Sequence, residues 1–172
     1  MHFPGGEGRY SEACPSALAA GGAGVLFWQG ESESSTWANA STWASRFTAF
    51  VASLRRDSND PTLPIVFAQL DTPTVDPAAV PYWSLVQRQQ ASVAIPNTAM
   101  ITTCDLPTHG VHVTAAGYVT AGRRFATALL RLNPTLTARP IPTHALARRL
   151  TPPPIAKPEK GTTKAAIVRC AR

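Results

Sequence analysis

The strongest constraint on the fold is a regular alternation between short apolar runs and segments with helical periodicity. The apolar runs cover residues 24–29, 64–70 and 99–105, and Gly, Pro, Asn or Asp bound each of them. Continuous apolar runs of this length are typical of strands buried on both faces of a parallel sheet. Segments in which apolar residues recur every three to four positions follow each run. The repeated order of strand and helix predicts an α/β fold with helices on both faces of a parallel sheet.

The first helix is predicted to start from an N-cap at Ser35 or Thr36 and to end near Arg56. Its apolar stripe includes both Trp37 and Trp43, so both tryptophans are expected in the core. The two later helices are predicted over residues 82–94 and 114–132.

The positive charge of the chain is concentrated at its C-terminal end. Residues 1–132 carry 8 Lys and Arg against 9 Asp and Glu, whereas residues 133–172 carry 8 against 1 and hold seven of the sixteen prolines. We therefore predict one domain over 1–132 and a basic, Pro-rich, mostly disordered tail over 133–172. The tail is either an electrostatic tether to an acidic surface or an extension without a specific partner. Because the domain itself is not basic, it is not predicted to bind nucleic acid.

Membrane insertion, disulfide stapling and secretion all lack a signal in the sequence. No run approaches the roughly 18 apolar residues of a spanning helix. The three cysteines, Cys14, Cys104 and Cys170, form no Cys-x-x-Cys spacing that would indicate a metal or redox site. The apolar stretch 13–28 is interrupted by Pro15 and several glycines and follows no basic cluster, so no signal peptide is expected and no location is predicted.

Polar residues gather where the predicted strands end. Residues 29–33, 69–76 and 105–112 would form the loops at the carboxyl edge of the sheet, where α/β proteins carry their chemistry. Within them, His112 lies two residues before Thr114, the predicted N-cap of the last helix. The positive end of that helix disfavours the imidazolium, so His112 is suited to accept a proton as a general base.

Two of these segments carry a family resemblance. Residues 24–33 (Gly-Val-Leu-Phe-Trp-Gln-Gly-Glu-Ser-Glu) and 109–118 (His-Gly-Val-His-Val-Thr-Ala-Ala-Gly-Tyr) resemble the sialate O-acetylesterase family of carbohydrate esterases, a branch of the SGNH (GDSL-like) hydrolases. Two further family motifs lie between them in the family's order, at 54–57 (Leu-Arg-Arg-Asp) and 63–65 (Leu-Pro-Ile). The resemblance implies a flavodoxin-like three-layer α/β/α sandwich that removes O-acetyl groups from sugars. It also implies a serine nucleophile, a histidine base and an acidic partner, without a metal or organic cofactor.

The resemblance assigns further residues to the site. Gln29, Gly30 and Glu31 match the family block that lines the oxyanion region, where glycine lets the backbone approach the ester and Glu31 is expected to orient the site. Gln69 and Gln90 also match family positions, the first at the end of a strand near this edge of the sheet and the second on the helix that follows.

The acid of the triad departs from the family pattern. The family places an Asp three residues before the histidine, and this chain has His109 there. A second imidazole cannot hold the ring of His112 as a carboxylate does. Asp105 is the substitute that we predict, although Asp105 can equally cap the turn before Pro107.

The nucleophile is the second departure. The family carries its serine on a Gly-Gln-Ser-Asn-type loop well upstream of the Gln-Gly-Glu block, and residues 1–24 contain no such sequence. Ser32 is not a substitute, because the family has a serine there too and does not use it. The chain therefore resembles an N-terminally truncated family domain.

Two hypotheses follow. The chain is a hydrolase acting on acetylated carbohydrates with His112 as base, or a non-catalytic remnant or pseudoenzyme that binds carbohydrate or a partner chain. In either case the exposed edge of a three-stranded sheet would allow self-association.

Overall fold

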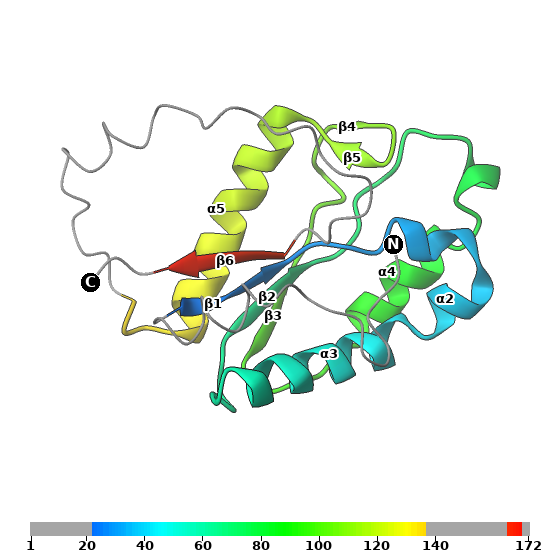
Figure 1. Cartoon of the computed structure of the whole chain (residues 1–172). Coiled ribbons are helices and arrows are strands. Elements are labelled where there is room, and N and C mark those ends of the chain that lie inside the picture. Colours follow the sequence, from blue (N-terminus) through cyan, green and yellow to red (C-terminus); the bar gives the residue numbers. More distant parts are fainter. Residues whose placement is uncertain (1–21, 137–164, 170–172) are drawn as a thin grey trace, which may run out of the picture.

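The computed structural model describes residues 22–136 and 165–169 (Figure 1). Within these ranges a four-stranded sheet has the strand order β3-β2-β1-β6, and a two-stranded hairpin lies beside it. β1, β2 and β3 pair in parallel, which confirms the predicted α/β fold. The strands are β1 (Gly22–Phe27), β2 (Ile65–Ala68), β3 (Thr98–Ile101), β4 (Thr108–His109), β5 (His112–Val113) and β6 (Ala165–Arg169). The helices are η1 (Ser32–Ser35), α2 (Trp37–Ser41), α3 (Trp43–Asp57), η2 (Pro77–Ala79), α4 (Trp83–Ala91) and α5 (Ala115–Leu132).

The sheet separates two apolar clusters, because successive strand residues point to opposite faces. On one face, Ile65 and Phe67 of β2 pack with residues of α3 and α4. On the other face, Val66 and Ala68 pack with residues of α5. The result is the three-layer arrangement in which α3 and α5 cover opposite sides of the sheet (Figure 1). None of the helices in the described ranges is long and apolar enough to cross a membrane.

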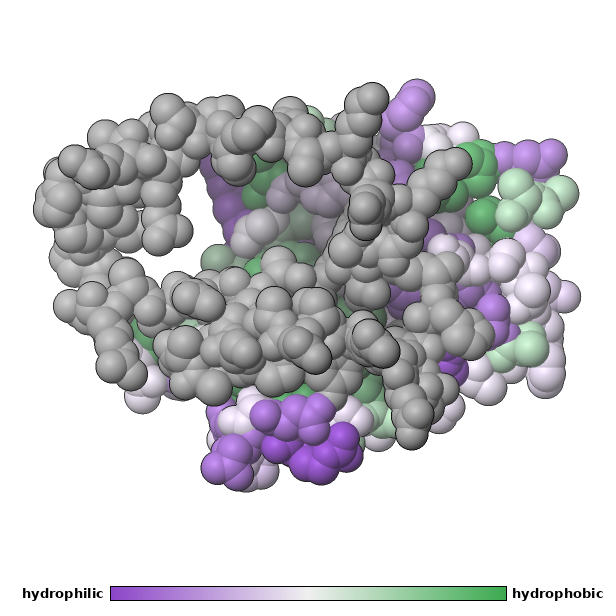
Figure 2. Space-filling view, viewed as in Figure 1, coloured by the Kyte–Doolittle hydropathy of each residue, from purple (hydrophilic) through white to green (hydrophobic). Residues whose placement is uncertain are grey.

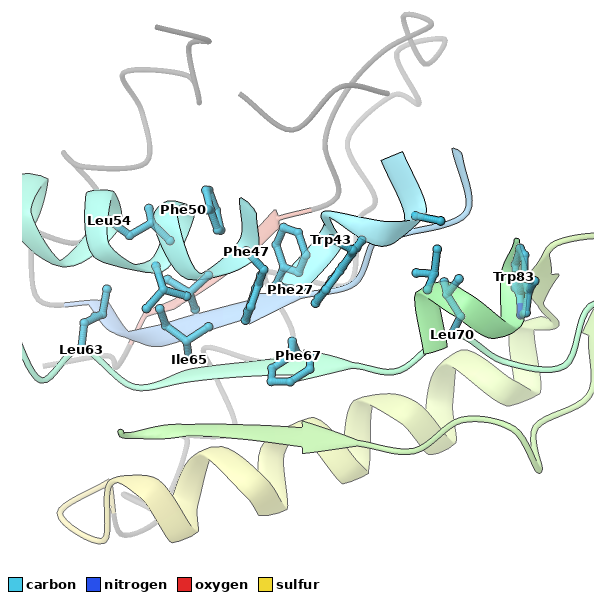
Figure 3. Packing of buried hydrophobic residues seen from close by; sticks show 14 residues of the cluster. Phe27, Trp43, Phe47, Phe50, Leu54, Leu63, Ile65, Phe67, Leu70 and Trp83 are labelled. Carbon is cyan, nitrogen blue, oxygen red and sulfur yellow. The ribbon is translucent and has the colours of Figure 1, made fainter. Parts of the chain in front are cut away.

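The centre of the larger cluster is aromatic. Phe27 of β1 lies 5.1 Å from Phe47 and 5.2 Å from Phe50, measured between ring centroids, and Trp43 stacks on Phe47 at 5.0 Å. Figure 3 shows these side chains filling the space between α3 and the sheet. Each buried aromatic side chain of this size contributes a few kcal/mol of apolar burial, so this contact fixes α3 against the strand that leads into the site.

The first predicted helix is interrupted, and the prediction for Trp37 was wrong. The N-cap at Thr36 is confirmed, because its side chain accepts a hydrogen bond from the Asn39 N–H. The helix then breaks at Thr42, where φ of −105° and ψ of 5° depart from helical values and the backbone N–H bonds the Ala40 carbonyl. The break takes Trp37 off the buried stripe, and Trp37 is 64% exposed whereas Trp43 is fully buried.

The C-terminal end of α3 is tied to the start of two strands. The Arg55 guanidinium donates to the carbonyls of Leu63, Pro96 and Asn97, at 3.1, 2.7 and 3.3 Å. Figure 2 shows hydrophilic residues gathered at the lower edge of the molecule, where α3 ends in Figure 1. The family-like motif at 54–57 therefore has a structural role. It lies at the amino ends of β2 and β3, and the predicted site lies at their carboxyl ends.

One strand comes from the predicted tail. Residues 165–169, which we expected to be part of a solvated extension, form β6 and pair antiparallel with β1. Their sequence, Ala-Ala-Ile-Val-Arg, includes two β-branched residues that favour a strand. β6 therefore covers one edge of the three parallel strands, and β3 forms the opposite edge of the sheet. The other tail residues, 137–164 and 170–172, lie outside the described residues.

Candidate active site

The predicted site begins with the loop that leaves β1. Gly30 has a φ of +149°, in the region that favours glycine. A Cβ at this position would lie 3.0 Å from both Gln90 Nε2 and Val86 Cγ1, which belong to buried side chains of α4. Both the backbone conformation and the close approach of α4 therefore require glycine. The Gly30 N–H donates a hydrogen bond of 3.1 Å to Glu31 Oε2, which fixes the next side chain.

The structure brings Glu31 and His112 together. Glu31 Oε1 lies 3.5 Å from His112 Nδ1. The Glu31 side chain is 20% exposed and that of His112 is 52% exposed, so the pair lies at the surface with its carboxylate partly shielded. The contact occupies the Nδ1 side of the ring and leaves Nε2 on the other side. We expected Glu31 to orient the site, and its carboxylate lies beside the predicted base.

His112 is held by a hairpin and by the start of α5. β4 and β5 pair through a tight turn, with His109 opposite His112. The Gly110 carbonyl accepts from the Thr74 N–H at 2.8 Å, which ties the hairpin to the loop after β2. The predicted N-cap at Thr114 is confirmed, since its hydroxyl oxygen accepts from the Gly117 N–H. A Cβ at Gly117 would lie 2.9 Å from the Val113 Cβ, so glycine allows α5 to begin directly against β5.

Asp105, the acid predicted from the sequence, is engaged elsewhere. Its two carboxylate oxygens accept from the Arg124 guanidinium at 2.7 and 2.5 Å in a bidentate ion pair. The hydrogen bonds from Arg124 lower the pKa of Asp105 to about 2. Among the described residues, Asp105 makes no hydrogen bond to His112. The prediction that Asp105 replaces the family's aspartate therefore does not match this geometry, and Glu31 occupies the position beside the ring.

Two buried polar residues lie beneath the loop. Gln29 and Glu33 are 5% and 1% exposed, and the Gln29 side-chain amide donates to Glu33 Oε2. Burial raises the pKa of Glu33, opposed in part by its hydrogen bonds. Gln29 Oε1 and Glu33 Oε1 have no hydrogen-bond partner among the residues that the structure describes. The two side chains hold the loop from inside, and the amide N of Gln29 is already occupied by Glu33.

Side-chain amides of α4 join the ends of β1 and β2. Gln90 is fully buried; its Oε1 accepts from the Leu70 N–H at 2.8 Å, and its Nε2 donates to the Gln29 carbonyl at 3.2 Å. Gln69 donates to the carbonyl of Gln87 on the same helix at 3.1 Å. Gln69 and Gln90, matched from the family pattern, therefore support the site loops. Gln87, which donates to the Leu70 carbonyl at 3.0 Å, has the same role and was not predicted.

No serine in the described residues hydrogen bonds to His112. Ser32 is exposed, and the Ser34 hydroxyl donates to the Glu31 carbonyl at 2.6 Å. Nor do the described residues contain a group of three or more His, Cys, Asp or Glu side chains that could hold a metal ion. In residues 22–136, then, the site consists of a histidine, a carboxylate and a glycine loop at the carboxyl edge of the sheet.

Fold and site together define a chain with the SGNH-type esterase fold. The chain belongs to the carbohydrate esterase family described as sialic acid-specific acetylesterases, whose family model matches residues 3–131. The resemblance found in the sequence motifs is thus confirmed.

Two solved structures are similar to the chain. A protein of Arabidopsis thaliana is 25% identical over 62% of this chain and 43% of its own, with a TM-score of 0.56. A protein described as a novel carbohydrate acetylesterase from Xanthomonas citri is 25% identical over 67% of this chain and 27% of its own, with a TM-score of 0.54. This chain therefore spans less than half the length of either structure. A comparison with curated proteins gives no match.

Proposed function

We propose that the site acts in the serine-type removal of acetyl groups from carbohydrates, with His112 as general base and Glu31 as its acidic partner. The observation that carries the proposal is the distance of 3.5 Å between Glu31 Oε1 and His112 Nδ1. In acyl-transfer sites of this kind, a carboxylate accepts the Nδ1–H of the histidine, so that the other ring nitrogen is the proton acceptor. The Glu31 contact accordingly favours Nε2 of His112 as the base.

Each half of the proposed reaction has two proton transfers at Nε2. As a serine hydroxyl attacks the acetyl carbonyl carbon, His112 takes its proton, and the developing imidazolium is stabilised by Glu31. When the tetrahedral intermediate collapses, the C–O bond to the sugar breaks and His112 returns the proton to the leaving sugar oxygen. Water then hydrolyses the acetyl-enzyme by the same route, releasing acetate and restoring the serine. The serine is supplied from outside the described residues in this proposal.

Glu31 replaces Asp105 in our assignment for two reasons. The Asp105 carboxylate is committed to Arg124 through both oxygens, and turning toward His112 would leave that guanidinium without its ion pair. Glu31 needs no such movement, because the Gly30 N–H already holds its other oxygen at 3.1 Å. The short loop 29–31 therefore supplies both the acid and the group that orients it.

Gln29 and Gly30 are proposed to support the acyl site rather than to react. Gln29 is anchored to Glu33 and to Gln90, and Gly30 allows the loop to pass close to α4. A loop fixed in this way holds its backbone groups and Glu31 in place before the ester binds, which is the arrangement that stabilises a developing oxyanion. The substrate class, an acetylated carbohydrate, comes from the family and from the Xanthomonas citri relative.

A non-catalytic role is the second candidate, and one observation favours it. Within residues 22–136 no serine hydroxyl reaches His112, so the described part of the site contains a base without a nucleophile. In that case the chain would bind an acetylated carbohydrate or a partner chain without hydrolysing it.

Hydrolysis of defined substrates separates the two candidates. Purified full chain is incubated with acetylated xylan and with O-acetylated sialic acid, and released acetate is measured. The enzyme hypothesis predicts acetate release that disappears in His112→Ala and persists in His109→Ala, a matched variant of the exposed neighbour on β4. Binding of either substrate by a folded chain that releases no acetate would support the non-catalytic role instead.

A further inference from the structure

Within the part of the chain that the structure describes, no strand pairs with the outer side of β3. β3 is the outermost strand on one side, and the carbonyls of Asn97 and Ile101 accept hydrogen bonds from β2. Because backbone groups alternate in direction along a strand, those of Thr98 and Met100 face away from the sheet. These two residues are only partly buried, as expected on an edge strand. In residues 22–136 and 165–169 no strand occupies this side, so the N–H and C=O groups of Thr98 and Met100 can pair with another extended segment.

A groove runs along this edge between β3 and α5. It has a volume of about 400 Å³, and its lining includes the strand residues Met100 and Thr102 and three arginines of α5. One of these arginines already bonds the edge backbone, because Arg124 Nη1 donates to the Thr102 carbonyl at 2.7 Å. The guanidinium groups of α5 therefore lie within reach of a chain that pairs with β3.

The groove has an excess of positive charge. Arg124 is balanced by Asp105, whereas Arg123 and Arg131 are exposed and form no salt bridge within the described part of the chain. α5 contains no Asp or Glu. Arg131 is also followed directly by the basic tail, in which 8 Lys and Arg face a single Glu. The groove and the sequence that follows it therefore favour an acidic ligand.

The spacing of the two unpaired arginines matches a strand. They are eight residues apart on α5, which corresponds to about 12 Å along a helix. Four residues of an extended strand span about 13 Å, and residues four apart point to the same face. Two carboxylates four positions apart on a strand beside β3 would therefore each meet one arginine.

We propose that this edge binds an acidic, extended peptide segment of a partner protein, which adds to the sheet beside β3 and places carboxylates on Arg123 and Arg131. The backbone of β3 supplies the affinity that does not depend on side chains, and the two arginines select for acidic residues at that spacing. A nucleic acid or a sulfated polysaccharide would satisfy the arginines and leave the backbone groups of Thr98 and Met100 unpaired. The surface is distinct from the candidate active site, so its test is independent of acetylesterase activity.

The test measures binding of a fluorescent peptide to the full chain. The peptide alternates Val and Thr and carries two Glu residues four positions apart. In a second version one Glu is moved by a single position. In a third version alternate amides are N-methylated, and both possible alternate sets of amides are tested. The protein variants are Arg123→Gln combined with Arg131→Gln, and Arg56→Gln as a matched control on α3. Amide hydrogen exchange of Thr98 and Met100 is followed by NMR in the same samples.

The expected result is specific on each count. The double variant binds the peptide about tenfold more weakly, the Arg56→Gln control is unchanged, and the shifted and N-methylated peptides both lose affinity. Exchange of the Thr98 and Met100 amides slows when the peptide is added. Unchanged exchange at these two amides would overturn the proposal, as would equal affinity for the N-methylated peptide. Tighter binding of single-stranded DNA or heparin, with the same arginine dependence, would assign the groove to a polyanion.

Discussion

The contact between Glu31 and His112 makes a quantitative prediction for the Glu31→Gln variant. Two unit charges at 3.5 Å attract each other by about 1 kcal/mol in bulk water and by about 5 kcal/mol at the effective dielectric constant of a protein surface. Because the His112 side chain is 52% exposed, solvent screening weakens this attraction. The interaction energy lost in Glu31→Gln is therefore about 1.5–3 kcal/mol. That loss falls on the transition state, where the imidazolium forms. It corresponds to a decrease in kcat of about 10- to 100-fold.

The assay compares two isosteric variants in the hydrolysis of a chromogenic acetate ester. Glu31→Gln is expected to lower kcat with little change in KM, since the lost interaction exists only when the ring is charged. Asp105→Asn is expected to leave kcat close to the wild-type value, because Asp105 contacts Arg124 and not His112. In ¹⁵N NMR spectra of the ring, the Nδ1–H tautomer of His112 should dominate in the wild type and decline in Glu31→Gln.

The reverse pattern would refute the reasoning. If Asp105→Asn removes activity while Glu31→Gln retains it, the aspartate moves to the histidine when substrate binds. The acid would then be the one that we predicted from the sequence. An unchanged tautomer in Glu31→Gln would exclude an orienting role for Glu31 in the free protein, independently of any activity.

Three further predictions concern the loop and its charges. Gly30→Ala should lower the free energy of unfolding by about 1–3 kcal/mol in urea titrations. The added Cβ would lie 3.0 Å from atoms of Gln90 and Val86, and the φ of this residue is +149°. Equal stability of the variant and the wild type would show that α4 can move away. Asp105 has a folded-state pKa of about 2, below its ordinary value, so it stabilises the fold above pH 3.8 and this contribution is lost as the pH falls toward 2. The stability difference between wild type and Asp105→Asn should therefore shrink over that range and be reduced by salt at neutral pH. For Glu33, burial raises the pKa, so the wild type should lose stability as the pH rises above 4.5 while Glu33→Gln does not; parallel thermal-unfolding curves for the two proteins between acidic and neutral pH would argue against a buried acid at this position.

Much of the fold could be predicted because its parallel strands are short apolar runs, of which β2 is fully buried and β1 largely buried. The run at 64–70 contains β2, the run at 99–105 overlaps all but the first residue of β3, and the periodicity of residues 114–132 located α5 together with its cap. The break between α2 and α3 was missed, because the apolar spacing continues across Thr42, where the backbone leaves the helical conformation. The short strands β4 and β5 were missed as well, since two residues are too few for any periodicity to appear.

The sequence suggested residues for the candidate site, whereas their contacts come from the structure. The order of the motifs led to His112 and to residues 29–31, and the structure brings these residues together. Sequence spacing favoured Asp105 as the acid because it lies near His112 along the chain. Its actual partner, Arg124, is 19 residues away and reaches it from α5. Which carboxylate faces the His112 ring depends on how loops from different strands meet. A motif in a single sequence does not give the distances between those loops.

The central claim is that His112 activates a serine in this chain. The most direct test treats the folded, purified chain with a fluorophosphonate probe, which labels activated serines, and maps the labelled peptide by mass spectrometry. We predict one labelled serine, with labelling abolished in His112→Ala, strongly reduced in Glu31→Gln and unchanged in His109→Ala. Labelling that persists in His112→Ala would contradict the role of this histidine. A folded chain without any labelled serine would also contradict the claim, since the catalytic serine would then be supplied elsewhere or be absent.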